Sequence, residues 1–303
     1  MSSGALEGTW FVAPTPFADD GSLDLQSQRR LVDGAIAWGV DGITAMGVTS
    51  EAMFLTAKER SAALAAVAEA VAGRVPLVVG CSASDVDAVL EHMREARDLG
   101  AVAAMVSAPP GADVRDLLSF FQRCAEDGGL PLVIQDEPAA TGVEMPVSVL
   151  GECLRAAGAT TVKLEAPPTA PKIAPLLEHD PTLRVFGGLG GVYALAELRA
   201  GACGTMTGFA FPEIMASMRR GVERGDGQAA AAVYDYYLPL IQFEAQPVVG
   251  LAVRKELLRR RGVIATARCR REPVTIDEVT DRELTDVLAR VGIRPDRKRL
   301  RTT

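Results

Sequence analysis

The stretch Thr160–Glu165 reads TTVKLE, a β-branched and apolar run with one lysine near its end. β-Branched residues favour strands, so we interpret the run as a buried strand. Lys163 is one of only five lysines in the chain, and the only one in a strand-like run. A cation in apolar surroundings is costly unless it is paired or loses its proton, and a desolvated lysine is the usual nucleophile for a Schiff base. The alternative is a salt-bridged lysine with a structural role alone.

Seven further strand-like runs accompany this one, and they alternate with longer segments of helical periodicity. This alternation is typical of parallel strands joined by crossover helices. Eight such units predict an α/β fold, a (β/α)8 TIM barrel. The predicted strands cover residues 10–13, 42–46, 76–80, 103–107, 131–135, 160–165, 184–187 and 204–207. The helical segments between them cover residues 25–38, 56–71, 85–99, 114–126, 146–156, 170–177 and 192–200.

The strand pattern stops before residue 212, and helical periodicity then covers 228–244, 248–261 and 277–291. We therefore expect a barrel over residues 1–223 and a C-terminal helical extension over residues 224–303.

A doubly wound open sheet is the rival architecture. It usually carries a glycine-rich phosphate loop after its first strand, but the sequence there is APTPF, at Ala13–Phe17. The glycine run Gly187–Gly191 comes late in the chain, and we interpret it as a tight turn or as room for a ligand.

Composition narrows the possible partners. A net charge of −7 argues against nucleic acid and anionic membranes, and no apolar run is long enough to cross a bilayer. Five widely spaced cysteines are typical of reduced thiols in a cytoplasmic protein. Two histidines offer no metal-ligand spacing, so we expect no metal and no cofactor. Arginines cluster in Arg254–Arg271 and in Arg294–Arg301, and we interpret both clusters as solvated surface.

The carboxyl ends of the strands are where a TIM barrel carries its active site. The second predicted strand ends in GVTSE, Gly47–Glu51, whose backbone N–H groups and two hydroxyls can hold a carboxylate. A turn that only caps the next helix is the alternative. The fifth strand ends in the polar group Gln135–Glu137. The sixth supplies Lys163 and, two residues later on the same face, Glu165.

Together these motifs resemble the dihydrodipicolinate synthase and N-acetylneuraminate lyase superfamily over essentially the whole chain. The resemblance rests on Pro14–Phe17, Gly47–Glu51, Pro138–Gly142 and the strand lysine Lys163. It implies a TIM barrel in which Lys163 forms an imine with pyruvate or another 2-oxo acid. It also implies a homo-oligomer, either a dimer or a homotetramer built as a dimer of dimers.

The same resemblance implies four substrate-binding residues. Thr49, with the backbone around Val48 and Ser50, matches the carboxylate-binding turn of the family. Gly188 matches a glycine that lies near the bound substrate.

The chain departs from the family pattern at the proton relay. Where the family has a tyrosine at the end of strand five, this chain has Gln135, and no tyrosine occurs before Tyr193. The first threonine of the turn is Val48 here, and the arginine that binds a second carboxylate in the true synthases falls at Ala140. A neutral amide can hydrogen-bond an intermediate, but it cannot act as an acid or a base near neutral pH.

We therefore name Lys163, Glu165 and Gln135 as the candidate catalytic residues. Glu165, Asp136 and Glu137 are the carboxyl groups available in place of the missing tyrosine, and Glu165 is preferred. Apolar residues flank Glu165, so we expect burial to raise the pKa of its carboxyl group, although a salt bridge to an arginine is the alternative.

The expected function is that of a class I, Schiff-base lyase acting on a 2-oxo acid such as pyruvate or a 2-keto-3-deoxy sugar acid. The reaction is aldol cleavage or condensation, or dehydration, and the protein is not an authentic dihydrodipicolinate synthase. The alternative is a catalytically impaired protein that binds a 2-oxo acid and serves in regulation. In either case we expect a cytoplasmic protein.

Overall fold

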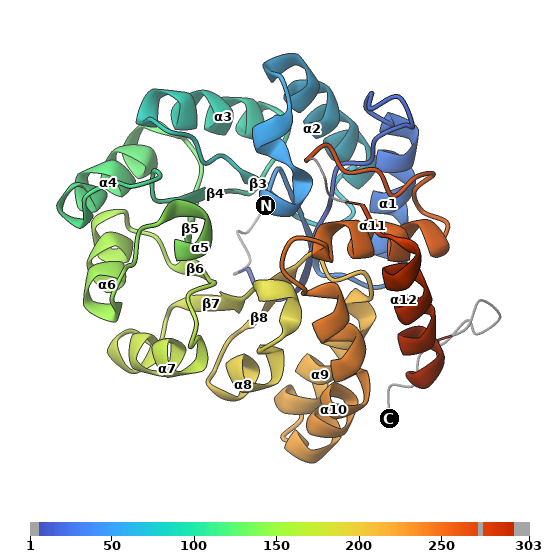
Figure 1. Ribbon diagram of the computed structural model, residues 1–303. Coiled ribbons are helices and arrows are strands. Elements are labelled where there is room, and N and C mark those ends of the chain that lie inside the picture. Colours follow the sequence, from blue (N-terminus) through green and yellow to red (C-terminus); the bar gives the residue numbers. More distant parts are fainter. Residues whose placement is uncertain (1–5, 272–274, 294–303) are drawn as a thin grey trace.

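Eight parallel strands close into a barrel in the order β1 to β8 (Figure 1). The computed structural model describes residues 6–271 and 275–293. Each of the eight predicted runs forms a strand, so the predicted TIM barrel is confirmed. The strands are β1 (Gly8–Val12), β2 (Gly42–Ala45), β3 (Leu77–Gly80), β4 (Ala103–Ser107), β5 (Leu132–Asp136), β6 (Thr161–Leu164), β7 (Arg184–Gly187) and β8 (Gly204–Thr207).

Helices surround the barrel and connect successive strands (Figure 1). The sequence pattern missed α9, although Pro212 occupies its first turn, a position that proline favours. The helices of the ring are α1 (Leu25–Ala37), α2 (Ala57–Val71), α3 (Val86–Asp98), α4 (Leu117–Asp127), α6 (Val147–Ala156), α7 (Ala170–His179), α8 (Ala194–Arg199) and α9 (Pro212–Glu223). Shorter turns are η1 (Val48–Ser50), η2 (Ala52–Phe54), η3 (Val114–Asp116), α5 (Pro138–Thr141) and η4 (Leu189–Gly191).

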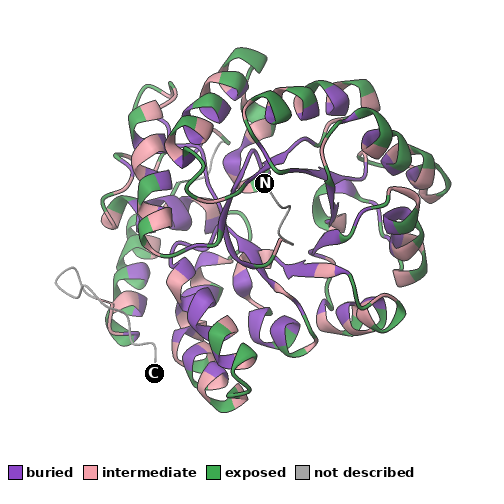
Figure 2. Cartoon of the chain, turned by 180° about the vertical axis from the view of Figure 1, so that it is seen from behind, coloured by how far each residue is buried: buried purple, intermediate pink, exposed green. Residues whose placement is uncertain are grey.

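Two apolar layers stabilise the barrel. The outer layer lies between the strands and the buried faces of the helices, as the purple surfaces in Figure 2 show. The inner layer fills the barrel, because alternate residues of each strand point to its axis. Its members are Trp10, Val12, Val78, Ala103, Met105, Val133, Phe186 and Met206.

The chain continues after α9 into α10 (Gly227–Glu244), α11 (Gly250–Arg260) and α12 (Glu278–Arg290). Arg261, just after α11, lies over the ring of Trp38 at 3.4 Å and forms an ion pair with Glu213. These contacts fasten the helical segment to α1 and α9.

The prediction that Arg254–Arg271 forms a solvated surface holds for the exposed Arg259, Arg268 and Arg271 but is wrong for the first two residues of the range. Arg254 and Lys255 are both buried, because each has an acidic partner inside the protein. The second predicted basic cluster, Arg294–Arg301, lies outside the described residues. Within 6–271 and 275–293, no helix is both long enough and apolar enough to cross a membrane.

Candidate active site

One row of side chains crosses the barrel near the carboxyl ends of four neighbouring strands. The parallel register pairs Ser107 with Gln135, Gln135 with Lys163, and Lys163 with Phe186. Phe186 belongs to the inner layer of the barrel, so its partners in this row face the interior as well. The register therefore brings together Gln135 and Lys163, which lie in separate motifs of the sequence.

Four polar side chains form a connected network here, two from this row and two that directly follow β5 and β6. The Nζ atom of Lys163 lies 2.9 Å from Oε2 of Glu165. The amide nitrogen of Gln135 donates to that same Oε2 at 2.7 Å and to Oε2 of Glu137, also at 2.7 Å. The Gln135 amide thus bridges two carboxyl groups, one of which is paired with the lysine. The sequence left open that Lys163 forms a salt bridge. That ion pair is present, and its partner is Glu165.

The two carboxyl groups of this network titrate in different ranges. Burial of Glu165 acts to raise its pKa, but the Lys163 charge and hydrogen bonds from Leu189 N and Gln135 together hold the pKa below its ordinary value. Burial raises the pKa of Glu137 to about 7, and the nearby Glu165 charge adds to the rise. The expectation of a raised pKa for Glu165 is therefore wrong, and its partner is Lys163 rather than an arginine. Glu137 is the carboxyl group that exchanges its proton near neutral pH.

Asp136 lies between these residues in sequence but outside the network. Successive strand residues point to opposite faces, so Asp136 faces the helices while Gln135 faces the interior. Its carboxylate forms an ion pair with Lys172 of α7. Asp136 is therefore not positioned to donate a proton at Lys163.

The turn after β2 offers a free hydroxyl and unsatisfied backbone donors. Oγ1 of Thr49 is buried and has no hydrogen-bond partner among the residues described. The first N–H groups of any helical turn lack partners within the turn, and η1 begins at Val48. The Ser50 hydroxyl is already in use, since it donates to the Ala13 carbonyl at 2.7 Å. Of the two hydroxyls predicted to bind a carboxylate, Thr49 is the one available, and Ser50 holds the turn against β1.

Glu51 anchors this turn to the C-terminal helices. Its backbone adopts a left-handed conformation, with φ of 56°, between η1 and η2. Its buried carboxylate forms an ion pair with Lys255 and accepts hydrogen bonds from the Arg270 N–H at 2.7 Å and the Arg271 N–H at 3.0 Å. Segments more than 200 residues apart in the sequence therefore hold the position of the turn.

Gly188, the remaining predicted site residue, lies against the network. A Cβ atom at this position would lie 2.2 Å from Oε1 of Glu165. The next residue, Leu189, donates its backbone N–H to that oxygen at 2.9 Å. The glycine thus makes room for the carboxylate, and the loop after β7 orients it.

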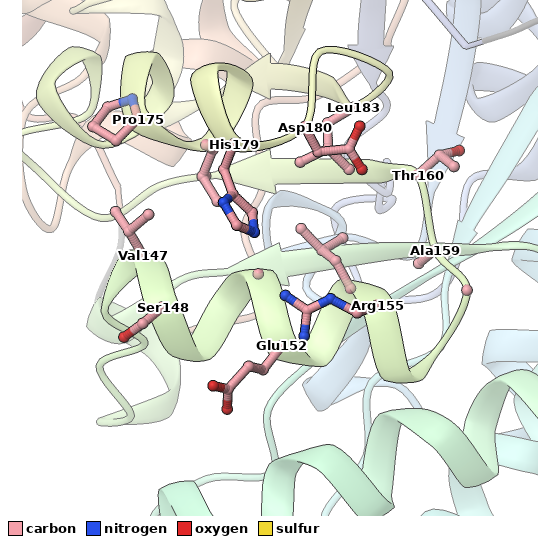
Figure 3. A pocket seen from close by; sticks show the side chains of 14 residues that line it. Val147, Ser148, Glu152, Arg155, Ala159, Thr160, Pro175, His179, Asp180 and Leu183 are labelled. Carbon is pink, nitrogen blue, oxygen red and sulfur yellow. The ribbon is translucent and has the colours of Figure 1, made fainter.

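A groove of about 950 Å³ lies elsewhere on the molecule, between α6 and α7. Figure 3 shows His179 extending from α7 toward α6, with Arg155 and Glu152 on the facing helix. None of the predicted site residues lines it. Among the described residues, no group of three or more His, Cys, Asp or Glu side chains is arranged to hold a metal ion.

Comparisons with known proteins show which family and fold the chain resembles. The profile of the Dihydrodipicolinate synthetase family matches residues 5–291. The chain is 34% identical to L-2-keto-3-deoxyarabonate dehydratase of Azospirillum brasilense over 94% of each chain. It is 32% identical to 4-hydroxy-tetrahydrodipicolinate synthase of Xanthomonas axonopodis pv. citri over 86% of each. The crystal structure of dihydrodipicolinate synthase from Rhodopseudomonas palustris superposes with a TM-score of 0.88 at 31% identity, covering 94% of this chain and 97% of that one.

Proposed function

The chain belongs to the Dihydrodipicolinate synthetase family, and we propose that it is a Schiff-base lyase that removes water from a 2-keto-3-deoxy sugar acid. Membership confirms the resemblance seen in the sequence and the expectation of a lyase. The observation that carries the proposal is the linkage of Lys163 to two carboxyl groups with different pKa ranges. The similarity to a dehydratase of this substrate class favours dehydration over aldol cleavage.

Binding and imine formation use Thr49 and Lys163. The free Thr49 hydroxyl and the first N–H groups of η1 hold the carboxylate of the 2-oxo acid. The Lys163 ammonium passes a proton to Glu165, 2.9 Å away, and the neutral amine attacks the C2 carbonyl carbon. Glu165 then delivers two protons to the carbonyl oxygen, the one it holds and a second that it takes from the amine nitrogen, and the oxygen leaves as water. The protonated imine then withdraws electrons from C3.

Elimination uses the two carboxyl groups in opposite roles. The ionised Glu165 removes a proton from C3, and the electron pair forms the enamine. The enamine expels the hydroxyl of C4, and Glu137, which is neutral below about pH 7, supplies the proton that lets it leave as water. Two carboxyl groups whose pKa values are pushed apart are the usual arrangement for a paired base and acid. Gln135 holds both in position through its amide.

We propose that the protein is not an authentic dihydrodipicolinate synthase. The position of the family's second-carboxylate arginine is Ala140, and the relay tyrosine is replaced by Gln135. The ionised carboxylate of Glu165 disfavours a substrate with a second carboxylate at this end of the barrel.

Borohydride trapping tests the Schiff base. The protein is incubated with pyruvate or with 2-keto-3-deoxyarabonate, reduced, and analysed by peptide mass spectrometry. We expect an adduct on Lys163 with both acids and none in Lys163→Ala, while Lys58→Ala, at an exposed lysine of α2, serves as the matched control and retains the adduct. Absence of an adduct from the unaltered protein would overturn the proposal.

Turnover is measured separately by following loss of water from 2-keto-3-deoxyarabonate. We expect Glu165→Gln to form the adduct slowly and to turn over at a rate about 100-fold lower, because general acid–base groups contribute at least that factor. An adduct without turnover of any 2-oxo acid would instead favour a binding or regulatory protein that has lost catalysis.

We also propose that the protein works in the cytoplasm as a homo-oligomer, a dimer or a tetramer. Support comes from apolar side chains beside the site: Val48 is 44% exposed, Met53 65% and Phe54 42%. Exposed apolar groups gathered in one segment favour burial against another copy. Light scattering after size exclusion tests the assembly, and a monomer at micromolar concentration would contradict it.

A further inference from the structure

Arg254 brings a guanidinium group from the C-terminal helices to the mouth of the barrel. It lies on α11, and only 7% of its surface is exposed. Gly208 follows Met206 by two residues and therefore shares its inward face at the end of β8. A Cβ atom on Gly208 would lie 3.0 Å from Nη1 of Arg254 and 3.0 Å from the carbonyl oxygen of Val12. The guanidinium thus covers the ends of β1 and β8.

The other terminal nitrogen of Arg254 lies toward the catalytic loop. A Cβ atom on Gly190 would lie 3.7 Å from Nη2. Gly190 belongs to η4, the turn whose Leu189 N–H holds Glu165. Arg254 therefore sits between the β8 end and the loop that orients the catalytic carboxylate.

Only part of the donor capacity of this guanidinium is used by the protein. Nε donates to Glu244 at 2.6 Å, and the other oxygen of Glu244 accepts the Ala210 N–H at 3.0 Å. Nη1 and Nη2 form no hydrogen bond within residues 6–271 and 275–293. A guanidinium carries five N–H donors in a rigid fork, so four of them are left for a ligand. Glu244 fixes the direction in which they point.

We propose that Arg254 is a specificity-determining residue that binds the hydroxyl groups of the substrate beyond C3. This inference rests on the proposed function, and it adds the means by which the site distinguishes a polyhydroxy 2-oxo acid from pyruvate. The four free N–H donors of Arg254 require oxygen acceptors on the ligand. Hydroxyls fit better than a second carboxylate, because Glu244 already pairs with the Arg254 charge and the ionised Glu165 is bound to the adjoining loop through Leu189.

The test compares two 2-oxo acids on one variant. In Arg254→Lys the charge beside Glu244 is kept, but the fork is lost. Half-saturation for borohydride trapping is measured with pyruvate, which has no distal hydroxyl, and with 2-keto-3-deoxyarabonate, which does. We expect the value for pyruvate to stay within about twofold and that for the sugar acid to rise about tenfold, the effect of one lost hydrogen bond to a charged group.

Two further variants keep the test decisive. Gly208→Ala adds a methyl group against Nη1, and it produces the same selective loss if Arg254→Lys does not fold. Arg259→Lys is the control, because Arg259 lies on the same helix and pairs with Glu256 at a half-exposed position.

Equal shifts for both acids, or none for either, would overturn the inference while leaving the Schiff base intact. Half-saturation for trapping is also measured with 2-oxoglutarate, which carries a second carboxylate. A rise for this acid alone in Arg254→Lys would overturn the inference and show that Arg254 binds a second carboxylate. If the unaltered protein forms no adduct with any acid, the proposed function itself fails, and this inference fails with it.

Discussion

Gly188 and Glu165 are in such close contact that a single methyl group cannot fit between them: a Cβ atom on Gly188 would lie 2.2 Å from Oε1 of Glu165. The carboxylate of Glu165 occupies the space that a side chain on Gly188 would need, so a glycine stands at this position. The contact ties the loop after β7 to the end of β6.

Gly188→Ala is therefore expected to displace Glu165 and to lower kcat about 100-fold, as a misplacement of about 1 Å at a catalytic group does. The protein still folds, because the loop can shift. Gly151→Ala is the control, since no atom lies within 4 Å of the added methyl group. That change leaves kcat unaltered and stabilises α6 by about 0.5–1 kcal/mol. Unchanged turnover in Gly188→Ala would remove the contact from the mechanism.

Activity is expected to fall as the pH rises through about 7. Burial raises the pKa of Glu137 to about 7, so the carboxyl group is neutral and able to donate below that pH and ionised above it. Glu137→Gln abolishes this alkaline decrease and lowers kcat about 100-fold at pH 6. The prediction is checked by measuring kcat as a function of pH for the unaltered protein and for Glu137→Gln. If the variant retains the decrease at the same pH, another group is the acid.

Substitutions at Thr49 and Ser50 are expected to have different effects: the first weakens substrate binding, and the second lowers the stability of the fold. The Thr49 hydroxyl has no hydrogen-bond partner among residues 6–271 and 275–293, so Thr49→Val leaves the unfolding free energy nearly unchanged. The same change raises half-saturation for pyruvate about fivefold to tenfold, because the hydroxyl is lost to the ligand. The Ser50 hydroxyl donates to Ala13, so Ser50→Ala lowers the unfolding free energy by about 1 kcal/mol. Urea unfolding and trapping titrations measure both. A stability loss in Thr49→Val equal to that in Ser50→Ala would contradict a free hydroxyl.

Lys255→Met is expected to destabilise the protein and to weaken substrate binding together. It leaves Glu51 buried without its cation, at a cost of about 3–5 kcal/mol. Because Glu51 adjoins η1, half-saturation for pyruvate also rises, while the Lys163 adduct still forms at saturation. Arg290→Met breaks an exposed ion pair with Asp286 and changes stability by less than about 1 kcal/mol. A loss no larger than that of the control would show that the buried pair does not hold the turn.

Much of this molecule follows from local patterns in the sequence. Strand-like runs alternate with helical periodicity, and that pattern is enough to predict the eight strands, since burial on both faces requires apolar runs. The scarcity of lysine in strand-like runs predicts Lys163 as a site residue, and the small-residue turn after the second strand predicts Thr49. The local pattern does not predict α9, and it predicts an exposed position for Arg254 and Lys255, because a run rich in arginine is more often solvated.

The tertiary structure alone decided how these groups are paired. The register of β5 and β6 set Gln135 beside Lys163, and the side-chain alternation turned Asp136 away toward Lys172. The ion pair with Lys163 lowered the pKa of Glu165, while burial raised the pKa of Glu137 to about 7. The physical reason is that a pKa or a buried ion pair depends on which charges and donors lie within a few ångströms. Residues distant in the chain meet only when the barrel closes, so no local pattern records their pairing.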